Sequence, residues 1–125
     1  MMTDAGDDLP DHAIVVRGGI MTAENLMNGV DEHLDHPGVY GMSVQAAVGM
    51  TVADLAKAGG LRNSRLGFAT AGDIRRAGFA LVKTAGMGRH HTLVVPRDFG
   101  EPAATALSKV FRHMDNPIPD RRRPR

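Results

Sequence analysis

The sequence predicts an α+β domain, in which a small mixed or antiparallel sheet with a C-terminal hairpin is covered by three to four helices. Short runs rich in β-branched residues alternate along the chain with segments whose apolar residues recur at helical spacing. Threonine followed three residues later by aspartate marks two of the helix starts. Two strand-like runs joined by a glycine-containing loop predict the hairpin.

One domain is expected to occupy most of the chain. A chain of 125 residues can bury one hydrophobic core, and 42% hydrophobic with 23% charged residues is a globular composition. We expect the acidic residues 1–11 to be disordered and residues 12–115 to form the domain. The arginine-rich residues 116–125 are expected to form a basic tail.

The first elements follow from alternation and capping. Residues 12–17 are β-branched and end at two glycines, which predicts a strand. Thr22 then caps a predicted helix over 23–35, whose apolar residues share one face. A second strand is predicted over 39–45, where apolar and small or polar residues alternate.

Two short helices are predicted where a threonine begins a capping pattern. Thr51 with Asp54 opens the first, and Thr70 with Asp73 opens the second. A third strand is predicted between them, over 65–69.

The last elements are a hairpin and a helix. Runs 79–84 and 90–96 are strand-like and are separated by AGMGR, which predicts a hairpin. Glu101 with the proline after it opens the last helix, whose apolar face is expected to extend to Met114.

The composition excludes several classes of protein. The chain has no cysteine, which excludes a disulfide scaffold, a thiolate nucleophile and a cysteine-based zinc site, and fits a cytoplasmic location. The N-terminus does not have the pattern of a secretory signal, and no apolar run is long enough to span a membrane. Aromatic residues are scarce, at 4%, so stacking of bases on aromatic rings is disfavoured.

The residues best suited to chemistry gather around the predicted hairpin. Neighbouring strand residues face opposite sides of a sheet, so only one of His90 and His91 can face a cleft. An imidazole can act as acid or base, and Lys83 on the partner strand is a catalytic candidate that could hold the phosphate and stabilise developing charge. Arg89 and Thr92 could bind the phosphate of the substrate. We expect His91 to be the catalytic residue, and His90 if the strand phase differs by one. The alternative is a pair of histidines without catalytic function at a strand start.

A second candidate is Arg17, which precedes two glycines. An arginine beside a closely approachable backbone could bind an anion, and Tyr40 and Ser43 of the next strand could line the same cleft. Arg17 could also be a surface residue before a turn, and Tyr40 could belong to the core.

Other polar clusters are weaker candidates. His33 and His36 share a predicted helix face, but no third ligand is evident, so a solvated helix end is favoured and no metal is expected. The arginines of the tail could add salt-dependent affinity for RNA or for an acidic partner.

The segment GDIRRAGFALVKTAGMGRHHTLVVP, with VRGG and VYGMSV before it, resembles small bacterial toxin-like proteins of the ribonuclease type. The resemblance implies a compact helix-plus-antiparallel-sheet fold and metal-independent cleavage of RNA in the cytoplasm, without a cofactor. It implies His91 as acid or base, and Arg17, Lys83 and Arg89 as phosphate contacts.

Two alternatives from other classes remain. Arg17 on an early strand, followed by Tyr40 and Ser43, is similar to the pattern of ADP-ribosyltransferases, which use a nicotinamide dinucleotide, but the glutamate expected on a late strand is missing. The second alternative is a non-enzymatic interaction module of the immunity, antitoxin or phage accessory type. A cognate antitoxin or other protein partner and a homo-oligomer are both compatible with so small a core.

Overall fold

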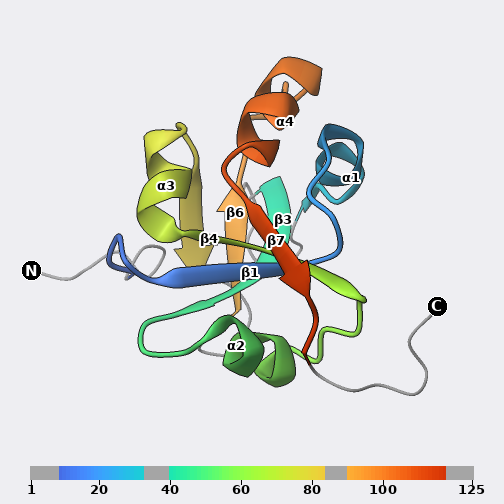
Figure 1. Ribbon diagram of the computed structural model, residues 1–125. Coiled ribbons are helices and arrows are strands. Elements are labelled where there is room, and N and C mark those ends of the chain that lie inside the picture. The colour runs from blue at the N-terminus through green and yellow to red at the C-terminus, as the bar shows by residue number, and fades with distance from the viewer. Residues whose placement is uncertain (1–8, 33–39, 84–89, 118–125) are drawn as a thin grey trace, which may run out of the picture.

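The computed structural model describes residues 9–32, 40–83 and 90–117, which form one antiparallel sheet with helices on both faces (Figure 1). This confirms the predicted α+β fold. The elements in chain order are β1 (Ile14–Gly18), α1 (Ala23–Asn28), β2 (Asp31–Glu32), β3 (Tyr40–Ala47), α2 (Val52–Ala58), β4 (Arg65–Thr70), α3 (Ala71–Arg76), β5 (Ala80–Lys83), β6 (His90–Val94), α4 (Glu101–Ser108) and β7 (Arg112–Asp115).

The strand order in the sheet is β5-β6-β3-β1-β4-β7, and β2 pairs with one end of β3. Strand β1 therefore lies in the interior of the sheet, between β3 and β4, and pairs with both in antiparallel register. The predicted hairpin is confirmed as β5 and β6, and β6 also pairs with β3.

The sheet separates two cores of unequal size. Helices α1, α3 and α4 cover one face, here called the three-helix face, and contribute Leu26, Ile74 and Leu107 to the larger core. Helix α2 covers part of the opposite face, here called the α2 face, and packs Leu55 against Val16 in the smaller core. Both faces of the sheet are apolar at the centre because alternate residues of β1 point to opposite sides.

The two predicted capping patterns are present. The Thr51 hydroxyl accepts a hydrogen bond of 3.0 Å from the backbone N–H of Asp54, whose carboxylate accepts one of 3.2 Å from the backbone N–H of Thr51. The Thr70 hydroxyl accepts a hydrogen bond of 3.2 Å from the backbone N–H of Asp73. Each cap satisfies backbone donors that the first turn of a helix leaves unpaired.

The helix predicted over 23–35 is too long, because α1 ends at Asn28 and the chain re-enters the sheet as β2. Gly29 is the C-cap residue, and its Cα lies against the Arg17 guanidinium with no room for a side chain. Packing of Gly29 against Arg17 of β1 therefore ends the helix, although the apolar residues after Asn28 continue at helical spacing. His33 and His36 lie outside the described residues.

The apolar face predicted to continue from α4 to Met114 is also wrong, because α4 ends at Ser108 and residues Arg112–Asp115 form β7. Met114 is paired with Leu66 of β4 and packs against the smaller core, whereas Phe111 is buried in the larger one. A helix could not place these two side chains on opposite faces of the sheet. No helix in the described ranges is long and apolar enough to cross a membrane.

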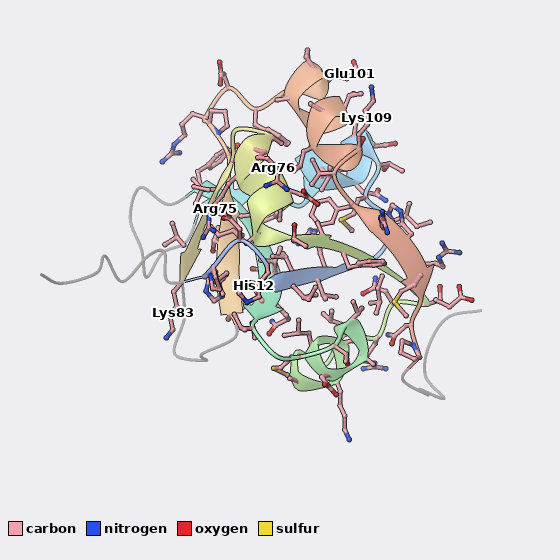
Figure 2. All side chains as sticks on the ribbon, turned by 60° about the vertical axis from the view of Figure 1, so that its left-hand side comes forward. His12, Arg75, Arg76, Lys83, Glu101 and Lys109 are labelled. Atoms are coloured by element: carbon pink, nitrogen blue, oxygen red, sulfur yellow. The ribbon has the colours of Figure 1, made fainter. Side chains whose placement is uncertain are left out.

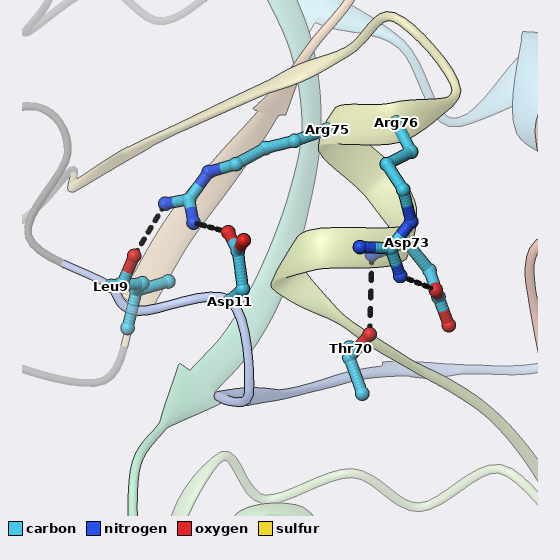
Figure 3. Close-up of polar contacts among 6 residues, drawn as sticks. All are labelled: Leu9, Asp11, Thr70, Asp73, Arg75 and Arg76. Atoms are coloured by element: carbon cyan, nitrogen blue, oxygen red, sulfur yellow. Dashed lines mark hydrogen bonds and ion pairs between the residues drawn. The ribbon is translucent and has the colours of Figure 1, made fainter.

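The chain ahead of β1 is held against helix α3 (Figure 3). Arg75 donates one hydrogen bond to the Leu9 carbonyl, at 2.6 Å, and another to the Asp11 carboxylate, at 2.7 Å. On the neighbouring side of the helix, Arg76 pairs with Asp73, and this hydrogen bond, with a further one from Thr70, lowers the pKa of Asp73. The domain described by the structure thus includes residues that precede the predicted first strand.

We expect Arg75→Ala to loosen residues 9–11 on α3, because it removes the two side-chain hydrogen bonds and leaves the one of 2.8 Å that the backbone N–H of Gly72 donates to the Asp11 carbonyl. Amide hydrogen exchange of Asp11 to Ala13 should accelerate, and the free energy of unfolding should fall by roughly 1 kcal/mol, the usual size for such partly exposed contacts. Arg76→Ala is the matched control on the same helix, because its described ion pair is local. Equal exchange in the two variants would contradict this role of Arg75.

Candidate functional site

The hairpin histidines lie on opposite faces of the sheet, as alternation requires. His91 is paired with Val44 of β3 and with Lys83 of β5, and it faces the larger core with 1% of its surface exposed. Lys83 is exposed, and its side chain projects away from the sheet at the edge strand (Figure 2). The residue predicted to be catalytic is therefore enclosed by the protein interior.

His90 lies on the α2 face within a small polar patch. It is half-buried and paired with Gln45, while the next residue on that face, Thr92, is buried and paired with Ser43. Ser43 is exposed. We call these four residues, Ser43, Gln45, His90 and Thr92, the α2-face patch.

The remaining predicted residues do not gather in one place. Arg89 lies outside the described residues. Tyr40 is half-buried against the larger core, with the guanidinium carbon of Arg97 4.9 Å from its ring centre. Because Ser43 belongs to the α2 face and Arg17 to the three-helix face, their side chains do not line one cleft.

Arg17 is a partly buried cation near the end of the central strand. It shares the face of Val15, and its guanidinium donates a hydrogen bond of 2.7 Å to the Ser43 carbonyl. Burial lowers the pKa of Arg17, but a guanidinium remains protonated. Among the side chains that the structure describes, no carboxylate pairs with Arg17, and its partly buried charge faces one carbonyl dipole.

Two adjoining cavities lie beside Arg17 and form one groove. The larger has a volume of about 600 Å³ and the smaller about 280 Å³, and they share Gly19, Ile20, Asn25 and Asn63. We call the whole the arginine groove. Its wall comprises Arg17, Gly18, Gly19, Ile20, Met21, Asn25, Asn28, Gly29, Arg62, Asn63, Ser64 and Arg65.

The two glycines of the groove are required by its shape. Gly19 has a φ of 97°, in the region that residues with a side chain rarely adopt. A Cβ on Gly18 would collide with the Asn63 side chain. These glycines allow the end of β1 to turn tightly beneath the loop that precedes β4, and they leave backbone accessible in the groove.

The opposite wall of the groove is a loop, residues 61–64, which is held by a buried asparagine. The Asn116 amide donates hydrogen bonds of 2.9 Å to the carbonyls of Leu61 and Asn63, and its backbone N–H donates one of 2.8 Å to the Ser64 carbonyl. Asn116 is 6% exposed, so the donor of these part-buried bonds is largely shielded from water. The loop that presents Arg62 is thereby fixed before any ligand arrives.

The first wall is fixed in the same way. The backbone N–H of Gly19 donates to the Arg65 carbonyl at 2.8 Å, and the Asn25 amide donates to the Ile20 carbonyl at 2.9 Å. The backbone N–H of Met21 donates to Nε2 of His113 at 2.8 Å, which joins the turn to β7. Strands β4 and β7 and helix α1 thus hold the turn after β1.

The charge of the groove is positive. Three of the wall residues that the structure describes are arginines, and none of these described wall residues is aspartate or glutamate. Arg65 pairs with Asp115 at 3.4 Å on the exposed surface, where an ion pair contributes little. Guanidinium and amide donors with accessible glycine backbone are the groups that bind phosphate and carboxylate ions.

Sequence reasoning singled out Arg17 and its glycines but missed Arg62, Asn63 and Arg65. These three residues are exposed, two in the loop 61–64 and one at the start of β4. The loop is held by Asn116, which lies more than 50 residues further along the chain. Only the Arg17-Gly18-Gly19 signal could have located the groove. In the described part of the chain, no three histidine, aspartate or glutamate residues cluster as metal ligands would.

Comparison of the chain with protein-family models, with curated proteins and with solved structures finds no match.

We expect Asn116→Ala to loosen the groove as well as destabilise the fold. The substitution leaves the carbonyls of Leu61 and Asn63 without their described donor, and buried unsatisfied groups cost about 1–3 kcal/mol. Denaturant unfolding should show that loss, and amide exchange should rise selectively at residues 61–64. Unchanged exchange there would contradict the role given to Asn116.

Proposed function

We propose that this protein binds RNA through its phosphate backbone and cleaves it as a toxin-type endoribonuclease, by metal-independent acid–base transesterification. One observation carries the proposal. Arg17, a partly buried cation with one carbonyl partner among the described residues, lies in a preformed groove whose described wall holds two more arginines and no carboxylate.

An anion in the groove would offset the cost of burying Arg17. A guanidinium that has lost part of its hydration interacts more strongly with a phosphate than an exposed one does. Arginine also presents paired donors that match phosphate oxygens. The arginines of residues 121–125 add positive charge shortly after Asn116, which favours a polyanion over a small anion.

The α2-face patch is the proposed place of the acid–base chemistry, with His90 in place of the enclosed His91. Gln45 separates His90 from Val16 in the sheet, and Gly18 begins the groove two residues further along β1. Two strand spacings and two residues put His90 roughly 12 Å from Gly18 in the plane of the sheet. A ligand that reaches both must be longer than one nucleotide, which is compatible with an RNA chain as the substrate.

In this reaction a base removes the proton of a ribose 2′-hydroxyl, and the 2′-oxygen attacks the neighbouring phosphorus. The bond to the 5′-oxygen breaks, and that oxygen takes up a proton from an acid. We assign His90 as the base because an imidazole nitrogen can accept a proton from a hydroxyl group. Cations on the phosphate stabilise the charge that develops there. The reaction needs no cofactor.

We expect the groove arginines to carry RNA affinity. The double variant Arg62→Ala/Arg65→Ala should weaken binding of an RNA oligonucleotide at least about tenfold, as expected for removal of hydrogen bonds to charged groups. The slope of log affinity against log salt should fall by about 0.7 for each phosphate that the variant no longer neutralises. Arg76→Ala, on helix α3, is the control and should bind as the wild type does.

Arg17→Met completes this experiment, because it removes the charge while keeping a long apolar side chain. RNA affinity should fall, and the free energy of unfolding should stay the same or rise, since a desolvated cation is removed. Wild-type protein that binds no RNA at low salt, or binding that is insensitive to all three arginines, would refute the proposal.

Cleavage is tested separately with matched histidine variants. His90→Gln should slow cleavage of a single-stranded RNA by about 10²–10⁴-fold, the usual contribution of an acid–base group. His12→Gln, which changes an exposed histidine ahead of β1, should leave the rate unchanged. Thermal unfolding of His91→Ala would report its structural role in the core. RNA that is bound but never cleaved by the wild type would favour the non-enzymatic interaction module.

A further inference from the structure

The arginine groove contains an exposed apolar side chain that phosphate binding does not explain. Ile20 is 48% exposed, and Val48 at 49% is the other large hydrophobic residue exposed to this degree among the described residues. Val48 lies in the turn after β3, whereas Ile20 belongs to the wall of the groove between asparagines and arginines.

The position of Ile20 is fixed by its backbone. Its carbonyl accepts hydrogen bonds from the Asn25 amide, at 2.9 Å, and from the backbone N–H of Thr22, at 3.0 Å. The next residue, Met21, is buried, so the chain turns inward immediately after Ile20. The side chain of Ile20 is consequently exposed on a turn that hydrogen bonds hold in place. A ligand that covers it would remove apolar surface from water, which is favourable.

We infer that the arginine groove holds one unstacked nucleotide of single-stranded RNA, with its base against Ile20 and its phosphate at Arg62 and Arg65. This inference rests on the proposed RNA binding and adds the form of the RNA. The groove supplies the three chemistries a nucleotide presents: an apolar surface for the face of a base, amide groups for its edge, and guanidinium groups for its phosphate. Its volume of about 600 Å³ lies within the range of small-ligand sites.

The same arrangement disfavours double-stranded RNA. In a duplex the faces of the bases are stacked and their pairing edges are engaged, so a base reaches a groove of this kind only after unstacking and unpairing. An unpaired strand has no such cost. The groove should therefore bind single-stranded RNA more tightly than double-stranded RNA. Phosphate contacts alone would not distinguish the two, because both present phosphates.

The experiment measures binding of three probes at fixed salt: a single-stranded RNA oligonucleotide, a duplex containing the same strand, and inorganic polyphosphate. The wild type should prefer the single strand. Ile20→Ser should weaken single-strand binding about fivefold, the lower end of the cost of removing a side chain that covers one base, and leave polyphosphate binding unchanged. Ile20→Phe should strengthen single-strand binding, because an aromatic ring stacks better on a base.

Val48→Ser is the matched control, since it removes an equally exposed apolar side chain outside the groove, and it should bind all three probes as the wild type does. Equal affinity of the wild type for single strand and duplex, or Ile20→Ser indistinguishable from Val48→Ser, would overturn the inference while arginine-dependent RNA binding survived. Failure of the wild type to bind either RNA would overturn the inference together with the proposed function.

Discussion

The position of strand β1 between β3 and β4 is the constraint on which the rest of the structure depends. Its residues must supply both cores in turn, so Val15 faces the three-helix side and Val16 faces α2. The same alternation fixes Arg17 on the three-helix face, beneath the end of α1, where an apolar residue would pack more easily. A charge in that position carries a desolvation cost that an apolar side chain would not have.

The groove follows from two features that bring distant parts of the chain to the end of β1. Gly18 and Gly19 let the chain turn without a side chain in the way, and Asn116 fixes the loop that closes the other side. Neither feature involves a large apolar residue. The hydrophobic cores position the strands, but hydrogen bonds from an amide side chain and the absence of two Cβ atoms shape the cavity between them.

Local patterns were sufficient to predict much of the fold. The two threonine caps, the hairpin and the facing of Tyr40, Met42 and Val44 to one side of β3 depend on neighbours in sequence. The caps were predicted at their residues, and the strands were predicted with bounds that differ by one or two residues. The end of α1 and the existence of β7 depend on packing against β1 and β4, which the spacing of apolar residues does not record. In the candidate site, Arg17 and its glycines carried a local signal. Arg62 and Arg65 did not, since an exposed arginine in a loop or at the start of a strand has no local pattern that reveals which distant part of the chain lies opposite it.

The unequal size of the two cores affects the groove through Leu61. The smaller core, under α2, contains few fully buried side chains, so this layer is expected to open more often than the sheet and the helices opposite. Leu61 packs against that core, its backbone N–H donates to the Ala56 carbonyl of α2, and its own carbonyl is held by Asn116. Opening of α2 and loss of the groove wall are therefore coupled equilibria. By mass action, a ligand that binds only the intact groove would suppress the opening of the α2 layer. The fraction of molecules in which α2 is open would therefore fall as the fraction of occupied groove rises.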